Sequence, residues 1–560
     1  TMFAATIALA LVASVTSRIQ SGPTLIQDTA PASKVQAAHK HVPSDSRRAL
    51  FLHFHTPHAH VSPPMQPLPP LQPPPPPWPP GYPLPADHVL VSSTPQLRHA
   101  LTGETDHQIL VLRAGAHLAL DGVQLSIGAG RRVRIVGDGD GPWPVIDGAR
   151  RSRLFDVSGV LELEGVHLTR GNADSGGCMR VRPGGHVSVH RGLFSLCTAA
   201  STGAGAGGGA LFVDAATAEL VNSTLEDCSV ANHGDGYAAG GAVYTRGASI
   251  SLTSTTISSC AATTTGAGTA WGGALVIVGG DLTMDDTIIT ECVAIASGGG
   301  RAQGGALYTT DASATVALTT ISNCTATTAG ADSFGGAMEI YGGSLTLDDS
   351  TITACVANTS GDDSAYGGAV YTREASTSLT NTTISDCTAL ASGGGPSYGG
   401  AMMILGGNVM LEGTTITACV ASASSVGNDD SAYANGGAVF IQDAQVTLAH
   451  SIISDCTAVT DGESAANAAY GGALHIRGGT MTLDDTTITA CAANATEVGH
   501  AYGGAVFAVL ANTLLTNTTI SDCTALVVKE GDAWGGAMAI IGGHVKLNLS
   551  TITACVANAT

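Results

Sequence analysis

Apolar and polar positions alternate along this chain in a pattern that returns about every 32 residues. After a Gly-Gly-Ala triplet, apolar residues stand two apart, as in Met338 and Ile340, with an unrestrained residue between them. A second alternating pair, Leu345 and Leu347, and a Thr-Ile-x-x-Cys element ending at Cys355 follow. A period of two with one variable face is typical of a β-strand with one buried side. The pattern predicts three short strands per unit and leaves no room for a helix.

The unit occurs eleven times between Ala210 and Cys555. The distance from the alanine to the cysteine is always 18 residues, whereas the distance from the cysteine to the next alanine ranges from 13 to 19. A constant core with this period is the mark of stacked repeats, in which each coil buries its apolar face against its neighbours. We predict an all-β solenoid of about 11 regular coils with a surface loop in each variable segment. Coils that rise about 4.8 Å each would make a rod roughly 60 Å long.

A family resemblance rests on the Gly-Gly-Ala-aliphatic and Thr-Ile-x-x-Cys elements. They resemble the repeats of bacterial polymorphic outer-membrane proteins, and more widely the right-handed parallel β-helix of pectin-lyase-like proteins, over roughly residues 88 to 560. The resemblance implies a right-handed coil, as parallel crossovers favour. The chain departs from the family where Ile-x-x-Cys stands in place of Phe-x-x-Asn, so that a cysteine ladder would replace an asparagine ladder. Coils ending in Ser-x-Cys alternate with coils ending in Thr-x-Cys, which indicates duplication of a two-coil unit.

The region before the repeats has a different composition. Residues 1–17 contain a short apolar run typical of a signal peptide or a truncated anchor. Residues 18–56 are expected to be disordered, with an incidental run of histidines (His53, His55, His58 and His60), and residues 57–86 form a proline-rich linker. Residues 87–207 are expected to form a cap with a short helix near Thr94-Pro95 and irregular coils, and residues 208–560 the regular repeats. The irregular strands are expected at 109–112, 118–120, 133–136, 154–157 and 161–168.

The distribution of charge limits the classes of partner that the chain can bind, and the cysteine spacing indicates where the cysteines lie. From residue 192 onward there are 6 basic and 31 acidic residues, so a nucleic-acid partner is not expected. An earlier arginine cluster is either a site for an anionic glycan or, as we favour, a solvated face of the cap: Arg131, Arg132, Arg134, Arg150, Arg151 and Arg153. Twelve of the 13 cysteines recur at one coil position, which predicts a buried ladder, partly paired at most.

Candidate chemistry is sparse. Asp-Asp pairs recur once per two coils, at Asp285-Asp286, Asp348-Asp349 and Asp484-Asp485, which favours a turn feature over a unique catalytic pair. We therefore assign no catalytic, cofactor-binding or metal-binding residue. Acidic segments such as Gly361–Ser364, Asn428–Ser431 and Asp461–Glu463 are either weak calcium sites or, as we favour, solvated loops. Thr-x-Thr pairs such as Thr351 and Thr353 predict two outward columns of hydroxyls, similar to those of ice-binding solenoids.

The sequence therefore predicts a non-catalytic, secreted or cell-surface β-helix with a structural, adhesive or glycan-binding role. A polysaccharide lyase or hydrolase and an ice-binding solenoid are the alternatives. The expected partner is a polysaccharide or a cell-surface glycan, and membrane contact is expected only through an N-terminal anchor or a segment beyond Thr560. Eight Asn-x-Ser/Thr sequons favour a glycosylated secreted protein: Asn222, Asn323, Asn358, Asn381, Asn494, Asn517, Asn548 and Asn558.

Overall fold

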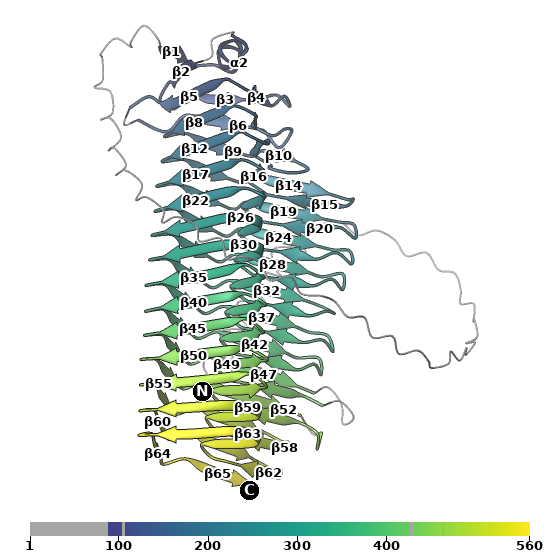
Figure 1. Ribbon diagram of the computed structural model, residues 1–560. Helices are drawn as coiled ribbons and strands as arrows, with labels where there is room; N and C mark the ends of the chain where they lie inside the picture. Colours follow the sequence, from purple (N-terminus) through teal and green to yellow (C-terminus); the bar gives the residue numbers. More distant parts are fainter. Residues whose placement is uncertain (1–87, 104–106, 140, 426–430, 463, 560) are drawn as a thin grey trace, which may run out of the picture. The chain divides into compact units, whose positions relative to one another are not determined.

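The computed structural model (Figure 1) describes residues 88–103, 107–139, 141–425, 431–462 and 464–559. The described residues belong to one compact unit, Pro75–Thr560. The predictions made for residues 1–17, 18–56 and 57–86 lie outside the described residues.

Each regular coil consists of five strand segments. In one of them, β34 (Met338–Tyr341) and β35 (Ser344–Asp348) belong to a 26-stranded sheet, β36 (Thr351–Thr353) to a 15-stranded sheet, β37 (Val356–Thr359) to a 13-stranded sheet and β38 (Ala365–Tyr366) to an 11-stranded sheet. We call these sheets A, B, C and D. Equivalent strands of neighbouring coils pair in parallel, so that the coils stack one on the next (Figure 1). The prediction of a parallel β-helix is confirmed.

The core is built by the three aliphatic ribs that the alternation predicts. Met338, Leu347 and Ile352 are fully buried and belong to one apolar cluster that runs through all the coils. In sheet B, Ile352 pairs with Ile384 of the next coil, and the isoleucine column continues in register to Ile416. Each methylene buried in this way contributes roughly 0.8 kcal/mol, so the stacked ribs stabilise the coils by apolar burial.

The segment after each cysteine is more ordered than the variable loop that we expected. It forms the strands of sheets C and D, which pack small residues such as Ala389, Ala391 and Ala365 against each other in a second, narrow core. Alanine and threonine give little hydrophobic signal in the sequence, so only the turn between the two strands is a loop. The prediction of three strands per coil is therefore wrong, because each coil has five strand segments.

The N-terminal coils follow the prediction with small corrections. Helix α2 (Thr94–Thr102) starts after Ser93 and buries Leu97, Ala100 and Leu101. The expected strands appear as β2 (His107–Leu112), β3 (His117–Ala119), β5 (Arg132–Gly137) and β7 (Phe155–Val157). The expected strand at 161–168 is two strands, β8 (Val160–Glu164) and β9 (His167–Thr169), because Gly165 turns the chain with a φ of +62°. No helix in the described part of the chain combines the length and apolarity that a membrane span needs.

Left-handed residues make the corners between sheets. At the corner from sheet A to sheet B, Asp286, Asp349 and Asp485 have φ angles of 49°, 44° and 46°. Aspartate tolerates this conformation better than most residues do. The interpretation of the Asp-Asp pairs as turn features agrees with this geometry. At the corner from sheet B to sheet C the residue before the cysteine takes the same conformation, for example Ala354 and Ala418, both with φ of 54°.

The cysteines form the predicted buried column just after this corner. Cys178 and Cys197 form a disulfide with a Cα–Cα distance of 5.4 Å, and the other eleven are free thiols. The Sγ of Cys387 donates a hydrogen bond to the carbonyl of Ser385 at 3.2 Å, a contact that recurs from coil to coil. Burial raises the pKa of thiols such as Cys387 and Cys419, so these thiols act as small apolar side chains.

Candidate functional site

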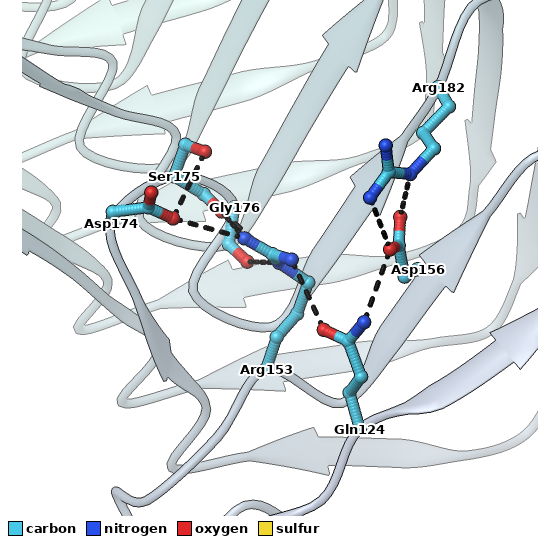
Figure 2. A network of polar contacts seen from close by, with 7 residues as sticks. All are labelled: Gln124, Arg153, Asp156, Asp174, Ser175, Gly176 and Arg182. Carbon is cyan, nitrogen blue, oxygen red and sulfur yellow. Dashed lines mark hydrogen bonds and ion pairs between the residues drawn. The ribbon is translucent and has the colours of Figure 1, made fainter.

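Arg153 is the centre of a polar network in the irregular coils (Figure 2). Its side chain is 9% exposed, and its guanidinium donates hydrogen bonds to the carbonyls of Ser175 and Gly176. It also donates to Gln124 Oε1 at 3.2 Å and pairs with Asp174 at 3.3 Å. All three nitrogens are engaged, so this buried cation joins three successive coils.

Asp156 of β7 is the second node of the network. It accepts two hydrogen bonds from Arg182, at 2.7 and 2.8 Å, and one from Gln124 at 3.1 Å (Figure 2). Burial acts to raise the pKa of Asp156, but the hydrogen bonds and charge of Arg182, together with the charge of Arg153 and the hydrogen bond from Gln124, outweigh it, so the net pKa is lowered. The same pairing raises the pKa of Arg182, so neither group is suited to take a proton from a substrate near neutral pH.

The other arginines of the predicted cluster are also largely engaged. Arg132 and Arg134 pair with Glu162 and Glu164 on the outer face of sheet A, and Arg131 donates to the carbonyl of Leu101 in the capping helix. Arg150 and Arg151 are exposed at the turn before β7. The expected solvated face of the cap is thus a set of ion pairs between coils, with Arg153 buried among them.

A shallow hollow of about 250 Å³ lies on the outer face of sheet A in the first regular coils. Its lining comes from β12 (His186–His190), β17 (Thr217–Val221), β22 (Ser249–Thr253) and β26 (Leu275–Asp285). These strands place outward side chains in register, and the polar ones that line the hollow are His186, Thr217, Glu219, Ser249, Ser251, Asp281 and Thr283.

Hydrogen bonds within the hollow connect adjacent coils. His186 Nδ1 lies 2.7 Å from the Thr217 hydroxyl, and Ser249 Oγ donates to Asp281 at 3.3 Å. The hollow therefore offers hydroxyl, imidazole and carboxylate groups on a rigid sheet. This set can exchange hydrogen bonds with a hydroxyl-rich ligand, while its two carboxylates disfavour an anionic one.

Two columns rich in aromatic side chains face each other where sheet D packs beside the outer face of sheet A. We call them the aromatic seam. The column on sheet D consists of the residues directly before Gly-Gly-Ala from Trp271 onward, and Tyr237 extends it by stacking on Trp271: Trp271, Gln303, Phe334, Tyr366, Tyr398, Asn435, Tyr470, Tyr502 and Trp534. The column on sheet A consists of Phe212, Tyr244, Val276, Tyr308, Glu339, Tyr371, Met403, Phe440, His475 and Phe507.

Successive rings of the sheet D column stack on each other. Tyr366 and Tyr398 have ring centroids 5.1 Å apart and planes 8° apart, and Phe334 and Tyr366 are 4.8 Å and 11° apart. Some rings of the sheet A column meet them edge-on, as Tyr371 meets Phe334, and others stack on them, as Tyr308 stacks on Trp271. Pairs of this kind contribute about 0.5–1.5 kcal/mol beyond their buried area. The expectation that the residue between the aliphatic positions lies on an unrestrained face is wrong, because sheet D covers it.

Polar residues interrupt the aromatic seam in matched pairs. Glu339 is 2% exposed and accepts a hydrogen bond from Gln303 Nε2 at 2.8 Å, while Gln303 Oε1 accepts from the Trp271 indole at 2.7 Å. Burial raises the pKa of Glu339 to about 8. In the same way His475 Nδ1 lies 3.0 Å from Asn435 Oδ1, and burial lowers the pKa of His475 to about 3. Both groups are neutral near pH 7.

The hydroxyl columns of sheet B are where the sequence places them. Thr351 and Thr353 lie half-buried on either side of the buried Ile352 and pair in register with Thr383 and Ser385. Hydroxyls of one column also bond in pairs, Thr353 with Ser385 at 2.9 Å, and Ile288 and Ile452 interrupt the other column.

The predicted acidic loops are partly within the described residues. Gly361–Ser364 forms the turn between sheets C and D, where Asp362 is exposed, while residues 426–430 and residue 463 lie outside the described residues. Among the described residues no group of three or more His, Cys, Asp or Glu side chains is arranged to hold a metal ion. The sequons Asn222, Asn381 and Asn517 occupy corners with positive φ, whereas Asn494 Oδ1 is buried.

Few known proteins match this chain. No family model matches the chain, and no curated protein matches it. Two solved structures are similar: a rhamnogalacturonan lyase, with 9% identity over 60% of this chain and 73% of that one (TM-score 0.21), and a PL6 family alginate lyase, with 9% identity over 83% and 100% (TM-score 0.18). At these TM-scores the assignment of the fold rests on the strand pairing described above.

Proposed function

We propose that the chain is a non-catalytic, secreted or cell-surface β-helix that binds a hydroxyl-rich, neutral polysaccharide in the hollow on sheet A. The observation that carries this proposal is the in-register set of hydroxyl, imidazole and carboxylate groups across neighbouring coils. Hydrogen bonds from such groups to sugar hydroxyls give orientation and specificity. The disulfide between Cys178 and Cys197 supports an oxidising compartment, and so does the apolar run within residues 1–17.

A bulky side chain in the hollow tests the proposal. Ser251→Trp fills it, whereas Ser378→Trp places the same ring in the same outward column four coils away. We expect the unmodified chain to be retarded by at least one neutral polysaccharide in affinity electrophoresis. Ser251→Trp abolishes the retardation and Ser378→Trp retains it. Equal retardation of both variants, or none by any neutral glycan, contradicts the proposal.

The lyase alternative is tested on the same material. Elimination from a uronate polymer yields an unsaturated product that absorbs in the ultraviolet. The arginine and aspartate groups of Figure 2 are paired with each other, so we expect no increase in absorbance with pectin or alginate. An increase that Ser251→Trp suppresses would replace binding by catalysis at this hollow.

Ice binding is a second candidate, favoured by the unbroken register of sheet B. Neighbouring hydroxyls there repeat about every 4.8 Å between coils and about 7 Å along the strand. The test is inhibition of ice recrystallisation by the chain and by a variant with Thr351, Thr383 and Thr415 replaced by valine. Loss of inhibition in the variant would support this candidate, and absence of inhibition in both would exclude it.

A further inference from the structure

The arginines of the regular coils are concentrated along the aromatic seam. From residue 192 onward six basic residues stand against 31 acidic ones, and four of the six are arginines. All four flank the aromatic seam: Arg246, Arg301, Arg373 and Arg477. In the regular coils, where acidic residues outnumber basic ones, the arginines therefore lie beside the rings of the aromatic seam.

Three of these arginines share one register column. Arg246, Arg373 and Arg477 are the last residues of β21 (Val243–Arg246), β39 (Val370–Arg373) and β54 (Leu474–Arg477), each two residues beyond the ring column on the same outward face. Arg301 lies on the opposite side, before β29 (Ala302–Gln303), with its guanidinium 5.7 Å from the centre of the Phe334 ring.

These guanidinium groups are accessible. The side chains of Arg246, Arg301 and Arg373 are 57%, 58% and 45% exposed. Arg301 and Arg373 meet carboxylates only at 3.5 and 3.9 Å, and Arg477 forms no hydrogen bond or ion pair with any residue that the structure describes. Loose pairs of this length on a surface contribute little, so Arg301 and Arg373 remain free to exchange partners. Arg246, in contrast, donates two hydrogen bonds to Asp214, at 3.1 and 2.9 Å.

The way the rings stack determines which chemical groups of a ligand they can contact. In the sheet D column Phe334, Tyr366 and Tyr398 cover one another's faces, so this run of rings presents edges to a ligand. Ring edges carry partial positive charge, and they attract carboxylates. A sugar ring that needs an open aromatic face finds none between these three stacked rings. Tyrosine, tryptophan and arginine are also the residues that dominate protein–protein hot spots.

We propose that the aromatic seam is a docking surface for an acidic polypeptide segment, whose carboxylates meet Arg373, Arg477 and the phenol hydroxyls of Tyr366 and Tyr398. Charge complementarity selects this occupant, since the remaining surface of the regular coils repels it. The buried Glu339 carboxyl is neutral near pH 7 and adds no repulsion. The proposal is independent of glycan binding at the hollow on sheet A.

Binding of poly-L-glutamate to the immobilised full chain tests this. We expect binding that weakens with added salt. Arg373→Gln combined with Arg477→Gln weakens it about tenfold or more, on the scale of hot-spot residues. Tyr398→Phe, which keeps the stack and removes one hydroxyl, weakens it less. The matched control is Arg132→Gln combined with Arg134→Gln, two arginines on sheet A away from the aromatic seam.

Three results would overturn the proposal: no binding of poly-L-glutamate, equal losses in the two arginine double variants, or tighter binding of polygalacturonate than of poly-L-glutamate in a manner that needs Arg373 and Arg477. The last result would make the occupant an anionic glycan. Unchanged circular dichroism of each variant shows that lost binding is not lost folding.

Discussion

Replacing Glu339 by glutamine is expected to remove a large pH dependence of stability. Burial raises the pKa of this carboxyl from 4.5 to about 8. Between these pH values the folded chain holds a proton that the unfolded chain has lost, so stability falls as the pH rises through the window. At about 1.36 kcal/mol per pH unit the total loss is about 5 kcal/mol, complete above pH 8 and absent below pH 4.5.

Glutamine at position 339 can keep the hydrogen bond with Gln303, but it has no carboxyl group that titrates. Its Oε1 can still accept from Gln303 Nε2, as Glu339 does at 2.8 Å. We therefore expect the variant to match the unmodified chain within about 1 kcal/mol near pH 5 and to exceed it by several kcal/mol at pH 9. The control is Glu374→Gln, because the side chain of Glu374 is 71% exposed and its removal should leave the pH profile unchanged.

Urea unfolding followed by circular dichroism and tryptophan fluorescence measures this difference at pH 5, 7 and 9. Trp271 donates to Gln303 and so reports on the same coils. Parallel stability profiles of Glu339→Gln and the unmodified chain between pH 5 and 9 would refute the reasoning, since they would mean that Glu339 reaches solvent.

Four further predictions concern other sites. His475→Gln should remove a loss of stability on the acid side, because the pKa of His475 is lowered to about 3 and the unfolded chain takes up a proton first as the pH falls through 6.5; denaturation midpoints at pH 4 and 7 measure it. Ala418→Asn should stabilise by up to about 1 kcal/mol, since asparagine tolerates the left-handed corner better, and thermal unfolding checks this. Arg153→Met should cost about 2–3 kcal/mol by leaving carbonyls of the network unpaired, whereas Arg151→Met should cost almost nothing in the same urea titration. Buried thiols such as Cys387 should resist iodoacetamide at pH 8 and react in guanidinium chloride, as intact mass reports.

The aliphatic interior can be predicted from the sequence, whereas much of what lies outside it cannot. Ile352 and its equivalents are predictable because a large apolar residue that recurs between two threonines, at a fixed distance from a cysteine, points into a core. Ala357, Thr359 and Ala365 are not, because small residues pack well in a narrow core without being conspicuously hydrophobic. The sequence therefore predicts loops where sheets C and D form.

The same omission hides the aromatic seam. Each ring is present in the repeat, for instance Tyr366 before Gly367-Gly368 and Tyr371 after it. These two positions meet across sheets A and D because of the way the chain turns after the cysteine. The spacing of motifs in the sequence does not determine this turn. The alternation places Glu339 on a variable face for this reason, whereas sheet D buries it. The hollow on sheet A likewise depends on side-chain shape over several coils and has no motif.

The polar interruptions of the aromatic seam show how duplicated coils can diverge without unfolding. Glu339, Asn435 and His475 are buried in these columns, so a polar side chain left there without a partner would cost about 1–3 kcal/mol. Gln303 on sheet D therefore forms a hydrogen bond with Glu339 on sheet A of the next coil. Asn435 on sheet D likewise contacts His475 on sheet A of the next coil. Each pair satisfies itself across the gap between sheets, which means that either member replaced by an aromatic residue alone would strand the other. Glu339 Oε2 still has no hydrogen-bond partner among the described residues. Burial of this carboxyl raises its pKa, and this shift gives the chain a stability that depends on pH.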